Sequence, residues 1–156
     1  MSITVDREAF RANGRLTAIR LAILTSRFME NWRRGIGDLE LAMILVVVVA
    51  ITGERLTRAP LDEELRGLDA ELPKGVRGEC NVSSIAAASG LNRETARRKV
   101  NTLIQAGYLS RSESGEITFS PDVRRRQKTG RLLTMQLEAV VRFTNDLLRE
   151  GVLRAA

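Results

Sequence analysis

Large apolar residues recur with a helical period near both ends of the chain. Between residues 15 and 34 they fall three to four positions apart, at Leu16, Ile19, Ile23, Leu24, Phe28 and Trp32. Toward the C-terminus the same spacing joins Leu133, Leu137, Val140, Val141, Thr144, Leu147 and Leu148. Residues spaced in this way share one side of a helix. The pattern predicts a mainly helical chain with an amphipathic helix toward each end.

The segment LAMILVVVVAI, from Leu41 to Ile51, holds eleven apolar residues without a break. It is too short for a membrane span, which needs about 20 apolar residues. It is also longer than the roughly 4–8 residues of a buried strand. Asp38 suits the N-cap of a helix and Gly53 can end one. We therefore expect a helix over Asp38–Thr52, buried on all sides in a bundle that two subunits can share.

A connector follows this helix. Residues 53–79 contain Pro60, Pro73 and several glycines, and they are expected to hold one short surface helix over Leu61–Leu68. From Cys80 the pattern changes, because NVSSIAAAS predicts a short helix and Ser89–Gly90 predicts a turn.

A second helix is predicted directly after this turn. Asn92 can cap it and Gly107 can end it. Its apolar stripe consists of Ala96, Val100, Leu103 and Ile104. The pattern then alternates, so Tyr108–Arg111 and Glu116–Phe119 are expected to be the strands of a hairpin with SESG at its tip.

Ser120–Pro121 signals the start of the last helix, which can bend at Gly130. The chain then divides into N-terminal helices (1–55), a connector (56–79), a winged helix-turn-helix segment (80–120) and a C-terminal helix (121–156). The expected fold class is mainly α, or α+β, with a winged helix-turn-helix between terminal dimerisation helices.

Composition argues against an enzyme and a metal site. The chain has no histidine, which removes the commonest general base and metal ligand, and a single cysteine, Cys80. No paired-carboxylate, nucleophile or phosphate-loop motif is present, so we expect no catalytic residues and no cofactor. The N-terminus lacks the pattern of a signal peptide, and a cytoplasmic protein without a membrane segment is expected.

The positive charge is concentrated in one segment. The net charge is +6, and residues 91–131 alone carry ten basic and four acidic side chains. A localised basic segment is expected of a protein that binds a polyanion, although a solvated charged face has the same composition.

A short helix, a glycine turn, a second helix and a hairpin, in this order, are typical of a winged helix-turn-helix. The first residues of the second helix meet base edges in the major groove, where arginine pairs with guanine and glutamate with cytosine. The candidates on this helix are Arg93, Glu94, Arg97, Arg98 and Lys99. Further candidates for DNA contact, mainly to the backbone, are Ser83, Ser84, Asn92, Thr95, Arg111, Arg124 and Arg125.

The segment SGLNRETARRKVNTLIQAGYLSR resembles the DNA-binding segment of bacterial winged-helix transcription regulators, in particular the Crp/Fnr, GntR and IclR families. In Crp-type regulators an arginine, a glutamate and a second arginine of this motif read bases. The resemblance assigns these roles to Arg93, Glu94 and Arg98 and a phosphate contact to Thr95. Ala96 stands where that motif has Val or Ile, and nothing before residue 80 resembles a cyclic-nucleotide domain.

The order of the segments is similar to that of the MarR family, in which the terminal helices of two subunits interlock. This resemblance implies a homodimeric transcription regulator that binds a pseudo-palindromic site in double-stranded DNA.

Several alternatives stay open at this point. Winged helices also serve as protein-interaction modules that bind no DNA. The aromatic residues Phe28, Trp32 and Phe143 suit core packing, and they also suit a pocket for a small-molecule effector. Cys80 suits a packing thiol, and a redox sensor is the alternative.

Overall fold

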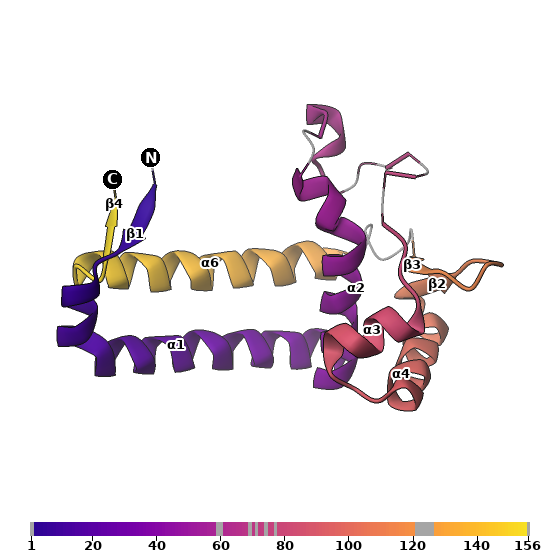
Figure 1. Ribbon diagram of the computed structural model, residues 1–156, viewed down its shortest axis with the longest axis horizontal. Helices are drawn as coiled ribbons and strands as arrows, with labels where there is room; N and C mark the ends of the chain where they lie inside the picture. Colours follow the sequence, from indigo (N-terminus) through magenta and orange to yellow (C-terminus); the bar gives the residue numbers. More distant parts are fainter. Residues whose placement is uncertain are drawn as a thin grey trace. The chain divides into compact units, whose positions relative to one another are not determined.

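The computed structural model describes residues 2–58, 61–68, 70, 72–73, 75–76, 78–120 and 127–155. The described chain is mainly helical, as expected, with two small antiparallel sheets (Figure 1). It splits into two compact units. Unit 1 joins the two ends of the chain, Met1–Gly35 and Arg131–Ala156, and unit 2 is the middle of the chain, Ile36–Gly130.

Unit 1 contains two long helices and a ribbon of two strands. The helices are α1 (Arg7–Ile36) and α6 (Gln127–Arg149), which run side by side (Figure 1). The strands β1 (Ile3–Val5) and β4 (Leu153–Ala155) pair in antiparallel fashion, so the two ends of the chain are neighbours. The side chain of Arg20 on α1 donates from Nε to Oε1 of Glu150 at 2.8 Å and also pairs with Asp146 on α6.

Both predicted terminal helices are confirmed. The first is longer than its apolar period indicated, since α1 begins at Arg7 and is kinked at Asn13. The second, α6, runs through Gly130 to Arg149. The expected start of this helix at Ser120–Pro121 lies partly outside the described residues, because Pro121 is not among them.

The valine run forms helix α2 (Leu39–Arg58) of unit 2, as expected. Asp38 caps it, because the amide of Leu41 donates to Asp38 Oδ1 at 2.9 Å. The predicted end at Thr52 is wrong, since α2 continues through Gly53. The ion pair between Glu54 and Arg58, one turn apart, supports the added turn.

The expectation that α2 is buried on all sides in a bundle that two subunits can share is met on one side only within a single chain. One side is buried, through Ala42, Ile44, Leu45, Val48 and Thr52, whereas Val46 is 42% exposed and Val49 is 52% exposed. The buried side packs on α3 (Val82–Ser89), α4 (Arg93–Gln105) and β3 (Ile117–Phe119). Two short helices and a hairpin cover only one side of a helix. The other side of α2 therefore remains exposed within unit 2.

The remaining elements of unit 2 follow the predicted order. The connector contains a 3-10 helix, η1 (Glu63–Leu65), which is shorter than the expected helix over Leu61–Leu68. Strands β2 (Leu109–Arg111) and β3 then form the predicted hairpin, with Leu109 opposite Phe119 and Arg111 opposite Ile117.

The two units divide the chain differently from the four predicted segments. The helix of the valine run shares a core with α3, α4 and the hairpin, with Ile44, Val48, Ile85, Val100 and Ile117 at its centre.

No single helix in the described part of the chain has the length and hydropathy to cross a membrane. Helices α1 and α2 reach the required length and hydropathy only when they are counted together as one bent pair.

Candidate nucleic-acid interface

Both ends of α3 are fixed by local structure, a capping box at its start and a glycine at its end. Asn81 Oδ1 accepts from the amide of Ser84 at 3.0 Å, and Ser84 Oγ accepts from the amide of Asn81 at 3.0 Å, so both ends of this box are satisfied. At the other end of α3, Gly90 has φ +72°, a conformation that favours glycine. Three residues, Gly90 to Asn92, then connect α3 to α4.

Helix α4 is held in unit 2 by its apolar side. Ala96, Val100 and Leu103 are buried against the core, and Asn92 Oδ1 caps the helix by accepting from the amide of Thr95 at 2.8 Å. Because alanine is small, α4 and the helices beneath it can approach closely at Ala96. The opposite side of α4 therefore faces outward along its length.

Lys99 anchors α4, and the expectation that it contributes to a DNA-binding face is not supported. Its Nζ lies 2.9 Å from both Asp38 Oδ2 and Glu40 Oε2, at the start of α2, and its side chain is only 16% exposed. The hydrogen bonds that the Lys99 ammonium donates to Glu40 and then to Asp38 raise the pKa of Lys99. An ammonium held by two carboxylates is not free to meet a phosphate.

Four charged side chains are exposed in the first half of α4: Arg93, Glu94, Arg97 and Arg98. Glu94 and Arg97 form a bidentate pair, with Arg97 Nε donating to Oε2 at 2.9 Å and Nη2 to Oε1 at 2.6 Å. The hydrogen bond from Arg97 lowers the pKa of Glu94. Arg93 and Arg98 form no ion pair with any described residue, and the charge of Arg98 acts on Glu94 from a distance, where it helps to lower the pKa of that carboxyl.

A residue that sequence reasoning missed extends this surface toward the hairpin. Arg111 on β2 donates from Nη2 to Asn101 Oδ1 on α4 at 3.0 Å. Asn101 is seven residues after Glu94 and four after Arg97, and this spacing places it on the same side of α4. This spacing is the feature of the sequence from which Asn101 could have been predicted to lie on the charged side of α4. The predicted residues Arg97, Arg98 and Arg111 thus border one outward surface of unit 2.

The loop of the hairpin is polar and acidic. Ser112 Oγ accepts from the amide of Glu116 at 3.0 Å, and Gly115 has φ +88°. Glu113 is exposed at the tip. A hydrogen bond with Glu79 raises the pKa of Glu116, with burial and the charge of Glu79 adding to the effect. This loop offers carboxylates rather than cations to a ligand.

The other predicted contacts have mixed outcomes. Ser83 is exposed in the first turn of α3, whereas the hydroxyl of Ser84 is used in the cap. The side-chain oxygen of Asn92 is likewise used in the cap of α4, and Thr95 is half-buried. Arg124 and Arg125 lie outside the described residues.

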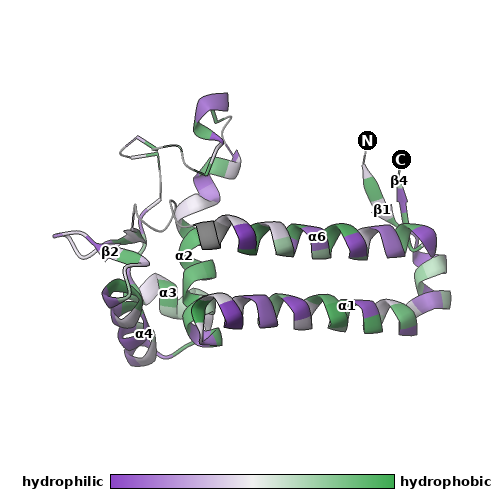
Figure 2. Ribbon diagram, turned by 180° about the vertical axis from the view of Figure 1, so that it is seen from behind, coloured by the Kyte–Doolittle hydropathy of each residue, from purple (hydrophilic) through white to green (hydrophobic). Residues whose placement is uncertain are grey.

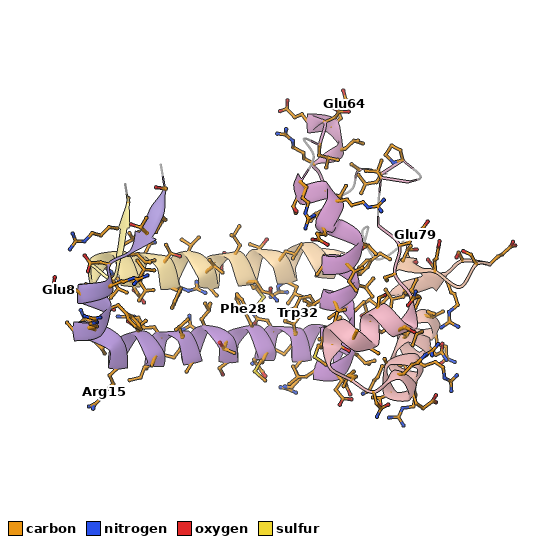
Figure 3. The ribbon with its side chains drawn as sticks, in the orientation of Figure 1. Glu8, Arg15, Phe28, Trp32, Glu64 and Glu79 are labelled. Atoms are coloured by element: carbon orange, nitrogen blue, oxygen red, sulfur yellow. The ribbon has the colours of Figure 1, made fainter. Side chains whose placement is uncertain are left out.

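The alternatives for Cys80 and for the aromatic residues are also constrained. Cys80 is buried, its Sγ lies 3.1 Å from the carbonyl oxygen of Ile117, and burial raises its pKa to about 11, which favours a packing thiol. In unit 1 a groove of about 720 Å³ is lined by Leu24 and Phe143 among others. Phe28 and Trp32 do not line this groove; they lie on the side of α1 toward α6 (Figure 3).

Comparison with known proteins does not assign the chain to a family. No family model matches the chain, and no curated protein and no solved structure is significantly similar to it.

Proposed function

We propose that the protein is a transcription regulator that binds double-stranded DNA through unit 2, with two copies on a pseudo-palindromic site. In this proposal α3 and α4 are a helix-turn-helix, α4 is the recognition helix and the β2–β3 hairpin is the wing. The proposal rests on one observation above all. Arg93 and Arg98 are exposed in the first half of a helix whose opposite side is buried, and neither forms an ion pair with a described residue.

The geometry of α4 suits the major groove. An α-helix fits into this groove, and residues in its first turns reach the base edges. Arginine donates two hydrogen bonds to O6 and N7 of guanine, and each such contact contributes about 1–3 kcal/mol of discrimination. Arg93 and Arg98 supply two such groups, while the cap at Asn92 and the anchor at Lys99 hold the helix.

The wing contributes through Arg111 rather than through its tip. Arg111 is held by Asn101 at the edge of the α4 surface and can reach a phosphate of the flanking backbone. Glu113 is exposed at the tip and repels phosphates. We therefore assign the tip no contact with the duplex.

The acidic tip favours one alternative, a protein-interaction module that binds a basic partner and no DNA. The two functions differ in their dependence on salt and on α4. DNA binding requires arginines on α4 and weakens steeply with salt, because bound counterions are released. A module that uses the wing tip depends on Glu113 instead.

The test is selection of random duplex DNA on the purified protein, followed by binding measurements on the selected sequence. We expect an enriched inverted repeat. Arg93→Ala should cost about 1–3 kcal/mol and relax specificity at one base pair per half-site. Arg15→Ala is the matched control, since Arg15 points into solvent from α1 in unit 1 (Figure 3). Absence of binding at any salt concentration contradicts the proposal.

A further inference from the structure

Unit 1 contains a groove between α1 and α6, with a volume of about 720 Å³. The residues that line it lie between Arg20 and Arg27 on α1 and between Ala139 and Arg149 on α6. At a rise of about 1.5 Å per residue, the segment of α1 alone extends for roughly 10 Å, so the groove is elongated along the helices. Figure 2 shows hydrophilic and hydrophobic residues alternating along both helices, which gives the groove walls of mixed character.

The directions of the two helices determine which residues face each other across the groove. The strand before α1 pairs with the strand after α6, so the helices run in opposite directions. Arg20 on α1 donates to Glu150 on α6 at 2.8 Å. Arg27 lies two helical turns further along α1, and it therefore faces residues 139–143, two turns earlier on α6. Arg27 and Arg142, which both line the groove, thus lie on opposite walls at the same level.

Between these two arginines the groove is apolar. Ala139 is buried, and Leu24 and Phe143 are half-buried, so these side chains form its base. Ile23 is exposed at the edge. An apolar base with a small number of charged groups beside it is typical of a binding site for a small organic molecule.

The ion pairs of the groove leave one positive charge without a partner. Three of its four arginines pair with carboxylates of α6, and these pairs join Arg20 to Asp146 and Glu150, Arg142 to Glu138, and Arg149 to Asp146. Arg27 is exposed and forms no ion pair with any described residue. The pair between Arg142 and Glu138 is long, at 3.8 Å, so Arg142 can donate to a further acceptor.

We infer that this groove binds a small amphipathic anion, namely a carboxylate at the end of an aliphatic chain. The carboxylate accepts hydrogen bonds from Arg27 and Arg142, because a guanidinium group matches the two oxygens of a carboxylate. The chain lies along the groove on Leu24 and Phe143. A single negative charge balances Arg27, whereas a phosphate monoester carries about two. The elongated groove suits a chain better than a ring.

A second copy of the chain is the competing occupant, and the charge of the groove disfavours it. Two identical grooves placed face to face would bring the unpaired Arg27 of each chain together, and like charges weaken association. The site also differs from an aromatic pocket, since of Phe28, Trp32 and Phe143 only Phe143 lines it. No residue of α4 takes part, so the inference goes beyond the proposed function and can be tested without DNA.

Isothermal titration of the full chain with octanoate tests the inference. We expect one octanoate per chain, with a Kd on the order of 0.1 mM for a ligand of about ten non-hydrogen atoms. Arg27→Gln should weaken binding about 10- to 100-fold, because it removes a hydrogen bond between charged groups. Arg15→Gln is the matched control, since it removes the same charge from α1 outside the groove (Figure 3), and it should bind octanoate as the wild type does.

Two related ligands separate the role of the charge from that of the chain. Octanol has the same chain without the charge, and it should bind at least about 10-fold more weakly than octanoate. Butanoate has the charge and a shorter chain, and its binding should be weaker by roughly 2- to 4-fold for each methylene removed.

Several results would overturn the inference. These are the absence of saturable octanoate binding at millimolar concentration, an unchanged affinity in Arg27→Gln, and equal affinities for octanol and octanoate. A change in the mass of Arg27→Gln in sedimentation would show that a second copy covers the groove, and it would overturn the inference as well. Binding to anionic phospholipid vesicles without binding to octanoate would do the same, because the groove would then serve a membrane. Failure to bind DNA affects only the proposed function.

Discussion

On α4 the guanidinium of Arg97 holds the carboxylate of Glu94 through two hydrogen bonds, of 2.9 and 2.6 Å, one turn of helix apart. Each charge is neutralised by the other in the unbound protein. The flanking residues Arg93 and Arg98 have no such partner among the described residues. The cationic groups that α4 offers to a duplex are therefore two rather than three.

Replacing Glu94 with glutamine should release Arg97 to bind phosphates. We expect tighter binding to random duplex DNA and a salt dependence steeper by about one charge, because each phosphate contact adds close to one unit to the slope. Fluorescence anisotropy at a series of salt concentrations measures both quantities. Glu64→Gln, an exposed carboxylate on η1, is the control and should change neither.

The same variant separates two roles of Glu94. If Glu94 only restrains Arg97, affinity should rise for all sequences alike. If Glu94 also accepts a hydrogen bond from cytosine, Glu94→Gln should lose its preference at one base pair of the selected site. An unchanged salt slope together with unchanged selectivity would remove Glu94 from the interface.

Lys99 is expected to act on stability rather than on DNA contact. Lys99→Met should destabilise unit 2 by about 1 kcal/mol, because Asp38 and Glu40 are partly exposed and solvent screens their pairs with Lys99. Urea unfolding measures this loss. Arg98→Met, one position earlier and exposed, should leave stability unchanged while it weakens DNA binding.

The Lys99 pairs also predict a pH dependence. The backbone hydrogen bond from Leu41, and next that from Lys99, lower the pKa of Asp38 below 3.8. A carboxyl with a lowered folded pKa contributes stability above its unfolded pKa and loses it as the pH falls through the folded value. The loss of stability between about pH 5 and pH 3 should therefore be shallower in Lys99→Met than in the wild type. Equal slopes would show that the pair contributes little.

Local features of the fold were predictable from the sequence, and the partners of the elements were not. A helix cap or a tight turn depends only on residues that are neighbours in the sequence. The residue types at Asp38, Asn92 and Gly90 therefore predicted two caps and one turn correctly. The sequence did not show that α2 packs on α3 and α4, because an uninterrupted apolar run fits many partners. For the same reason, the sequence did not show which apolar residues of α2 are exposed, namely Val46 and Val49.

The candidate site shows a similar division. The exposed positions of Arg93 and Arg98 followed from the apolar stripe of α4. The anchoring role of Lys99 did not, since it depends on two carboxylates far away in the sequence, one of which, Asp38, lies 61 residues earlier in the chain. The contact between Arg111 and Asn101 likewise depends on how the hairpin folds back onto α4. Pairs of this kind are set by tertiary structure, which residue spacing alone does not give.

Gly78 is expected to be required where the connector approaches α2. Its amide donates to the carbonyl oxygen of Thr52 at 2.9 Å, and a Cβ at this position would lie 3.0 Å from the carbonyl oxygen of Ile51. Gly78→Ala should therefore cost about 1–3 kcal/mol, because the connector must shift away from α2. Gly67→Ala is the matched control, since a Cβ there meets nothing within 4 Å. Equal stability of the two variants in urea would show that the connector yields freely.

The carboxyl pair formed by Glu79 and Glu116 beside the β2–β3 hairpin predicts that stability falls as the pH rises. A hydrogen bond with Glu79 raises the pKa of Glu116 above 4.5 in the folded protein. Folding therefore favours the protonated form, and this contribution is complete below the unfolded pKa and lost as the pH rises through the folded pKa. Glu116→Gln removes the titrating group and lets an amide donate to Glu79, so its advantage over the wild type should grow from about pH 4.5 upward and then level off.

Thermal unfolding from pH 4 to pH 8 measures this difference. Glu113→Gln removes a carboxylate from the tip of the same hairpin, three residues earlier, and serves as the control. If both variants change stability by the same amount at every pH, the effect comes from the net charge of the hairpin and not from the contact between Glu116 and Glu79. If only Glu116→Gln shows the rising advantage, the pair of Glu79 and Glu116 opposes folding at neutral pH, and the acidic character of the β2–β3 hairpin lowers the stability of the protein.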